Sequence, residues 1–215
     1  MDFLLAAIDI VLHLEHYLDQ WIPQLGAGTV IIVLALVIFA ETGLVVTPFL
    51  PGDSLLFTIG ALCARDLLPL TQVMIVLSVA AILGDTLNYS VGKFLGHWVA
   101  QKFSRVVKPE YLAKTHEFYE KYGGKTIVIA RFVPIVRTLA PFVAGVGEMG
   151  YRSFAVYNIV GGIGWILSMT LAGFFFGNLE FVKKHFSLVV VGIVILSVLP
   201  MLIELYRHRR DFKRA

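Results

Sequence analysis

Four charged side chains in strongly apolar surroundings offer most of the chemistry in this sequence. Glu41 and Asp53 lie in an apolar stretch that contains prolines and glycines. Arg131 and Arg137 lie in a similar stretch in the second half of the chain. A charge at the centre of a bilayer costs at least about 2.5–3.5 kcal/mol, so each of these groups needs a counter-ion or water. We therefore expect acids and arginines to meet in one solvated site.

The two arginines are suited to binding a phosphate group, because a planar guanidinium donates paired hydrogen bonds to its oxygens. Arg131 and Arg137 are six residues apart, which on an unbroken helix would point them about 120° away from each other. Pro134 lies between them and can kink the segment, so that both converge. Glu41 and Asp53 would neutralise the arginines in the empty state and could take up protons.

Each charged or polar residue of these apolar segments also has a purely structural interpretation. Asp53 could cap the helix that follows it, and Arg131 could extend to the membrane interface. The acid–arginine pairs could be structural salt bridges. Asp85, with Asn88 and Tyr89 one turn on, is expected to make polar contacts inside a helix bundle, and a role in proton passage is a second interpretation.

No metal site or catalytic cluster is evident in the sequence. His13 and His16 are three residues apart but have no further ligands near them. The single cysteine, Cys63, excludes an intramolecular disulfide. No Ser-His-Asp or Cys-His set can be assembled, and a membrane lipid phosphatase would need such a set. We therefore expect no metal, no cofactor and no enzymatic activity.

Composition indicates an integral membrane protein, and the apolar segments along the chain predict an all-α fold. The chain has 215 residues, of which 58% are hydrophobic and only 15% charged, and its mean hydropathy is +0.80. Soluble domains usually carry about 25% charged residues. The basic residues concentrate in the 97–125 loop and in the C-terminal tail, which places both on the cytoplasmic side. This charge distribution requires no nucleic acid partner.

The apolar segments differ in length, and the difference separates spans from shorter elements. The predicted spans are 70–96, 152–177 and 187–204, and the basic tail is 205–215. The apolar piece 55–63 would reach only about 14 Å, half of the hydrocarbon core, so we predict re-entrant helical hairpins around it and over 126–147. The residues expected to break these hairpins are Pro48, Pro51 and Gly52 in the first, and Pro134, Pro141 and Gly145 in the second.

The two halves of the chain match in kind. Amphipathic helices are predicted over 3–22 and 110–122, and each precedes a broken hairpin and a long helix with a late Gly-xxx-Gly pair. We predict a single membrane domain with repeat one over about 3–96 and repeat two over about 110–177. One span per repeat would invert the second repeat relative to the first, with the site at their interface. The glycine pairs would also permit a homodimer.

Several stretches of the chain resemble the DedA family of bacterial inner-membrane proteins, which carry a VTT (SNARE-associated) domain. These stretches are 39–57, 84–96, 114–126, 130–145 and 157–165. The resemblance covers nearly the whole chain and implies opposed re-entrant hairpins and the movement of lipids across the cytoplasmic membrane. It also implies that the functional acids are Glu41 and Asp53, and that the functional arginines are Arg131 and Arg137.

The family resemblance also suggests substrates. Members are associated with returning undecaprenyl phosphate to the inner leaflet, with a proposed dependence on the proton gradient, and others with phosphatidylethanolamine movement. We therefore expect a multi-pass inner-membrane flippase for undecaprenyl phosphate that is coupled to protons and has a cytoplasmic C-terminus. A phosphatidylethanolamine flippase or scramblase, which would use the same acids on the ammonium group, and a proton-dependent small-ion antiporter remain as alternatives.

Overall fold

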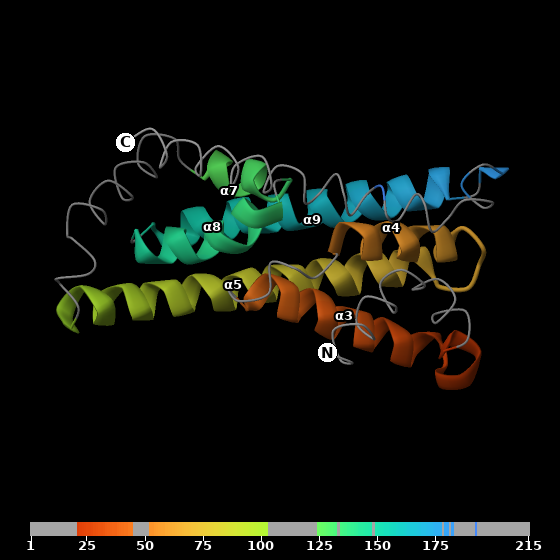
Figure 1. The fold of residues 1–215 in the computed structure, drawn as a ribbon, viewed down its shortest axis with the longest axis horizontal. Helices are drawn as coiled ribbons and strands as arrows, with labels where there is room; N and C mark the ends of the chain where they lie inside the picture. Colours follow the sequence, from red (N-terminus) through yellow and green to blue (C-terminus); the bar gives the residue numbers. More distant parts are fainter. Residues whose placement is uncertain are drawn as a thin grey trace, which may run out of the picture. The chain divides into compact units, whose positions relative to one another are not determined.

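The computed structural model describes residues 21–44, 52–102, 124–132, 134–147 and 149–177, together with the isolated residues 179, 180, 182 and 192. Every element of regular structure within these ranges is a helix (Figure 1). They are α3 (Ala27–Gly43), α4 (Gly52–Cys63), α5 (Leu70–Lys102), α7 (Lys125–Ala130), α8 (Pro134–Val146) and α9 (Tyr151–Phe176). The predicted helix 110–122, most of 3–22, the hairpin residues Pro48 and Pro51, most of the span 187–204 and the tail 205–215 lie outside the described residues.

Two of these helices are long and apolar enough to cross a membrane. They cover Leu70–Leu95 within α5 and Tyr151–Phe176, with 26 residues each, which gives a length of about 39 Å against a hydrocarbon core of about 30 Å. The outer surfaces of both helices carry exposed apolar side chains such as Leu83 and Val160. These two spans agree with the predicted ranges 70–96 and 152–177. The described part of the chain is all-helical, which is consistent with the predicted all-α membrane protein.

The helices α3 and α4 are shorter than α5 and α9, and α4 is too short to cross a membrane. Their 17 and 12 residues correspond to about 26 Å and about 18 Å. Gly52 is the first residue of α4, and Asp53 lies in its first turn. Apart from Asp53, every residue of α4 is buried, so this short helix is surrounded by protein.

The break in the second half of the chain lies between α7 and α8, just before Pro134. Arg131 caps the C-terminus of α7, and Pro134 is the first residue of α8. A proline suits this position, because the first helical N–H has no partner within the helix. Pro134 therefore starts a helix instead of kinking one. Pro141 and Gly145, which were predicted to break the hairpin, lie inside α8 and do not end it.

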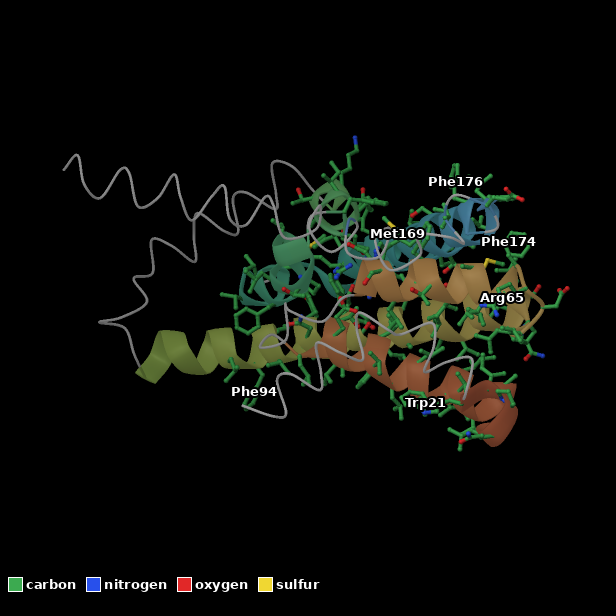
Figure 2. All side chains as sticks on the ribbon, turned by 45° about the vertical axis from the view of Figure 1, so that its right-hand side comes forward. Trp21, Arg65, Phe94, Met169, Phe174 and Phe176 are labelled. Carbon is green, nitrogen blue, oxygen red and sulfur yellow. The ribbon has the colours of Figure 1, made fainter. Side chains whose placement is uncertain are left out.

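The described residues group into two compact units. Unit 1 comprises Met1–Val30, Pro51–Thr71 and Ser168–Ala215, and unit 2 comprises Ile31–Leu50 and Gln72–Leu167. In unit 1, α4 packs against the end of α9 that carries Met169, Phe174 and Phe176 (Figure 2). The helices meet at glycines, because a Cβ atom on Gly60 would overlap the carbonyl of Thr170 and one on Gly173 would overlap the carbonyl of Phe57.

Unit 2 contains a second contact of the same kind, between α5 and α8 (Figure 1). A Cβ atom on Gly92 would overlap the Phe142 carbonyl, and one on Gly145 would overlap the Tyr89 carbonyl. In both units a Phe-x-x-Gly segment on a short helix therefore meets a glycine on a long helix. Gly60 in α4 and Gly145 in α8 therefore have corresponding positions in the two contacts. The absent side chain at Gly145 thus serves close packing and not a chain break.

The α4–α9 contact provides a first testable prediction. The substitution Gly173→Leu would force its new side chain into the Phe57 backbone and separate the two helices, which we expect to cost about 1–3 kcal/mol or more. Thermal unfolding of the protein in detergent measures the loss. The matched control is Gly164→Leu on the same helix, where no atom lies within 4 Å of an added Cβ. Equal stability of the two variants would contradict this packing.

Candidate functional site

Four charged side chains are buried among the described residues, and all of them belong to unit 2. Glu41, Asp85, Arg131 and Arg137 are 0%, 1%, 2% and 4% exposed, respectively. We call them the charged cluster. Since the cluster contains two acids and two arginines, its formal charge is zero when all four groups are ionised.

Arg137 and Glu41 form the first ion pair of the charged cluster. Nη2 of Arg137 in α8 lies 2.5 Å from Oε1 of Glu41 in α3. The guanidinium also lies over the ring of Trp165 in α9, 4.5 Å from the ring centroid, which stabilises the cation through the negative face of the indole. The predicted pairing of an acid from repeat one with an arginine from repeat two is present in this contact.

Arg131 and Asp85 form the second ion pair. Nη2 of Arg131 donates hydrogen bonds to Oδ2 of Asp85 in α5 and to Oδ1 of Asn158 in α9. The amide nitrogen of Asn158 donates to the carbonyl of Ile82 at 3.1 Å and approaches Oγ1 of Thr86 at 3.3 Å. These contacts hold the Asn158 amide so that its oxygen points toward the guanidinium.

The partner of Arg131 differs from the sequence-based expectation. Glu41 and Asp53 were expected to neutralise the two arginines, and Asp85 was assigned only a secondary role. Asp85 instead contacts Arg131 directly. Asp53 lies in the first turn of α4, in unit 1, so its part in the site stays a prediction. The sequence did not predict this contact, because a single acid in a long apolar helix is equally expected where it only makes structural contacts between helices.

Asn88 links the two segments that carry the first ion pair. Its Nδ2 donates hydrogen bonds to the carbonyl of Thr42 at 3.0 Å and to the carbonyl of Thr138 at 2.8 Å. We call these two bonds the Asn88 bridge. Thr42 directly follows Glu41, and Thr138 directly follows Arg137. The bridge therefore fixes the backbone on both sides of the Glu41–Arg137 pair.

Glycines on α5 bring the bridged helices close enough for a single amide to reach both. Gly84 lies four residues before Asn88, and a Cβ there would come within 2.9 Å of the Phe39 carbonyl of α3. Gly92 lies four residues after Asn88 and contacts α8 at Phe142. Residues four apart share a helix face. On this face of α5, α3 therefore packs at Gly84 and α8 packs at Gly92, with Asn88 between the two contacts.

Tyr89, the third secondary polar residue of the sequence analysis, has a packing role. Its hydroxyl donates to the carbonyl of Met149, and its ring stacks on Phe154 with centroids 4.3 Å apart. The side chain is only 2% exposed. Tyr89 therefore attaches α5 to the start of α9, and this position accounts for both its hydroxyl and its ring.

Two glycines of α9 leave room for Arg131. A Cβ atom on Gly161 would lie 3.0 Å from Cδ and 3.1 Å from Nε of Arg131, and one on Gly162 would lie 3.5 Å from Nη2. These two glycines, Asn158 and Trp165 all belong to α9, so α9 packs along one side of the charged cluster. None of these four residues of α9 was predicted to take part in the site. A signal was available, because Asn158 is a lone amide in an apolar helix.

Several buried polar atoms of the charged cluster and of Asn88 have no hydrogen-bond partner within the described part of the chain. They are Nε and Nη1 of Arg131, Oδ1 of Asp85 and Oδ1 of Asn88. A buried polar group without a partner costs about 1–3 kcal/mol, so water or a ligand must satisfy these atoms. Donors and acceptors are both present, which suits a phosphate group together with protons. In the described ranges, no three His, Cys, Asp or Glu side chains come together as a metal site requires.

The VTT domain family matches residues 50–175. Protein DedA of Escherichia coli (strain K12) is 48% identical over 218 residues, which cover 100% of this chain and 99% of that protein. An uncharacterised membrane protein of Mycobacterium tuberculosis (strain H37Rv) is 44% identical over 184 residues, or 83% of this chain and 81% of the relative. The inner membrane protein YqjA of Escherichia coli (strain K12) is 31% identical over 179 residues, with the same coverages of 83% and 81%. No solved structure matches the chain.

Proposed function

Because this chain belongs to the DedA family of VTT-domain membrane proteins, we propose that it moves a phosphate-bearing lipid across the bacterial inner membrane. Undecaprenyl phosphate is the proposed substrate, and proton movement drives the exchange. The observation that carries the proposal is the charged cluster, in which two buried arginines lie beside two buried acids. The partners of the protein are then membrane lipids and protons, and its activity is transport, not chemical conversion.

A purely structural origin of the cluster is a poor explanation for two buried ion pairs. Replacing a buried pair with well-packed apolar residues is often neutral or stabilising, because burying charges is costly. Charged groups inside membrane proteins are therefore rare and mark ligand or proton paths. Guanidinium groups match the geometry of phosphate oxygens, and Arg131 has two nitrogens that no described residue occupies. A lipid phosphate is the ligand that these groups fit best.

In the proposed mechanism, the phosphate enters the cluster and the hydrocarbon tail remains in the bilayer. The phosphate competes with the acids for Arg131 and Arg137, and the acids take up protons as their positive partners are shared. Asp53, at the start of α4, is proposed to join this exchange when the hairpins move. A ligand can shift the inward- or outward-facing state only by its different affinity for the two, so the cluster must bind phosphate differently in each.

The proposed architecture is an inverted repeat with two re-entrant hairpins. The short helices α3 and α4, the break before α8 and the repeated Phe-x-x-Gly contacts support it. The basic loop and basic tail support a cytoplasmic C-terminus. In this arrangement each long helix would contact the short helix of the other repeat, which would bring residues of both repeats to one site.

A leaflet-accessibility assay in reconstituted vesicles tests the function directly. We expect wild type to move labelled undecaprenyl phosphate faster with a pH gradient than without one. The Arg137→Lys variant keeps the positive charge but loses the planar fork, so we expect it to lose most of the transport. Arg152→Lys, at an exposed arginine of α9, is the matched control. Wild-type rates for Arg137→Lys would contradict phosphate binding by this residue.

Phosphatidylethanolamine is a second candidate substrate, and one observation favours it. Oδ1 of Asp85 and Oδ1 of Asn88 are acceptors without a partner in the described residues, and acceptors of this kind can bind an ammonium group. Labelled phosphatidylethanolamine in the same vesicles separates the two substrates. Movement of this lipid alone would replace the first proposal with the second.

A further inference from the structure

Asp85 is an acid of the charged cluster that contacts Arg131 through one carboxylate oxygen only. We propose that Asp85 takes up the proton that accompanies a lipid phosphate into the site and releases it when the lipid leaves. The inference rests on the proposed function, because it requires that a phosphate binds Arg131. It assigns the proton to a residue of α5, and not to either of the acids that the family resemblance points to.

The contacts of Asp85 leave one oxygen available. Oδ2 contacts Nη2 of Arg131, whereas Oδ1 has no hydrogen-bond partner within the described residues. The side chain is 1% exposed, so no bulk water replaces that partner. A proton placed on Oδ1 therefore breaks no existing hydrogen bond. The resulting hydroxyl can donate to an oxygen of an incoming phosphate.

Arg131 could bind a phosphate and keep its present hydrogen bond to Asn158. Asn158 accepts a hydrogen bond from Nη2, and its own amide is held by the Ile82 carbonyl. Nε and Nη1 of Arg131 have no partner among the described residues. These nitrogens can bind phosphate oxygens while Nη2 stays with Asn158. The guanidinium would then be shared between the phosphate and the carboxylate of Asp85.

The net charge of the charged cluster after a phosphate binds is the reason to place a proton on Asp85. The two acids and two arginines of the cluster sum to zero, so an added phosphate leaves a net negative charge in a buried site. An uncompensated buried charge costs several kcal/mol. Arg131 and Arg137 are the charged groups that act on Asp85, and Glu41 lies 2.5 Å from Arg137. A proton taken up from solvent together with the phosphate would neutralise Asp85, and it would return to solvent when the phosphate departs.

Calorimetric titration of the full-length protein in detergent tests this assignment. Farnesyl phosphate is the soluble probe, and farnesol, which lacks the phosphate, is the ligand control. Measurement in two buffers of different ionisation enthalpy gives the number of protons taken up per ligand bound. Wild type is expected to take up about one proton more per bound ligand than the Asp85→Asn variant, and this comparison is needed because a phosphate monoester, whose second pKa is about 6, can take up a proton itself. The Asp85→Asn variant should bind the probe without this uptake.

Two further variants make the result specific. Asp66→Asn changes an exposed acid with a positive φ of 58°, which asparagine tolerates, and it should leave the proton uptake unchanged. If Asp85→Asn does not fold, Asp85→Glu replaces it. The infrared band of a protonated carboxyl group that appears on binding should then shift relative to wild type.

The outcomes separate this inference from the proposed function. Probe binding with unchanged proton uptake in Asp85→Asn, or a carboxyl band that does not shift in Asp85→Glu, overturns the role of Asp85 and leaves lipid transport standing. Failure of wild type to bind farnesyl phosphate overturns the proposed function and this inference with it. Loss of proton uptake in Asp85→Asn but not in Asp66→Asn supports the assignment.

Discussion

The substitution Arg137→Met is expected to destabilise the protein and to abolish lipid transport at the same time. Glu41 is fully buried and lies 2.5 Å from Arg137, so removal of the guanidinium takes a positive charge away from a buried carboxylate. Breaking a buried ion pair in this way costs about 3–5 kcal/mol. The loss should appear as a lower melting temperature in detergent and lower abundance in the membrane. Arg152→Met, at an exposed position of α9, should change neither.

The double variant Glu41→Gln/Arg137→Met separates stability from function. Both charges are absent, so the penalty for an isolated charge disappears and most of the stability should return. Transport should remain absent, because no guanidinium is left at this position to bind phosphate. A double variant that is stable and transports lipid at the wild-type rate would show that the pair serves folding alone. A double variant as unstable as Arg137→Met would show that Trp165 packing, and not charge, dominates the site.

The long helices and the buried charges could be predicted from the sequence, because both depend on local properties. The spans in α5 and α9 follow from the length of apolar segments, and α4 follows from an apolar segment that is too short to cross a bilayer. The prediction that arginines need acidic partners follows from the cost of burying charge. In each case the residues of one short segment are enough to make the prediction.

The choice of partners could not be predicted, because it depends on how helices pack. Asp85 and Arg131 are 46 residues apart in sequence, and nothing local favours Asp85 over Asp53 for that pairing. Asn158 contributes to the site only because Gly161 lets Arg131 lie against α9. Pro134 was expected to kink a helix, but a proline also suits the start of one, and the local sequence does not distinguish the two.

The glycines show the same difference between features that follow from the local sequence and features that depend on packing. The late glycines Gly92 and Gly173 make equivalent contacts in the two units, which agrees with the predicted repeat without proving it. Gly145 was predicted to break a hairpin, whereas its packing against α5 corresponds to that of Gly60 against α9. A glycine that allows close approach and a glycine that breaks a chain are identical in sequence, and only the facing backbone tells them apart.

The second large effect is expected at Asn88, where a change of one atom should disrupt the site. Asn88→Asp keeps the shape of the side chain but replaces the donor of the Asn88 bridge with a carboxylate oxygen. The carbonyls of Thr42 and Thr138 would then face a buried anion, and each also loses its hydrogen bond, at about 1–3 kcal/mol per group. We expect a loss of stability similar to that of Arg137→Met. Ser90→Ala, at an exposed position of α5, is the control.

A double-mutant cycle tests whether the Asn88 bridge acts on the ion pair or only on packing. Asn88 is bonded to the residues that directly follow Glu41 and Arg137, so its loss should displace both charged groups together. The stability effects of Asn88→Ala and Glu41→Gln should then be less than additive, with a coupling of about 0.5–3 kcal/mol. Asn88→Ala combined with Gly173→Leu, whose contact lies in unit 1, should be additive. Equal coupling in both cycles would mean that Asn88 supports the fold in general and does not position the Glu41–Arg137 pair.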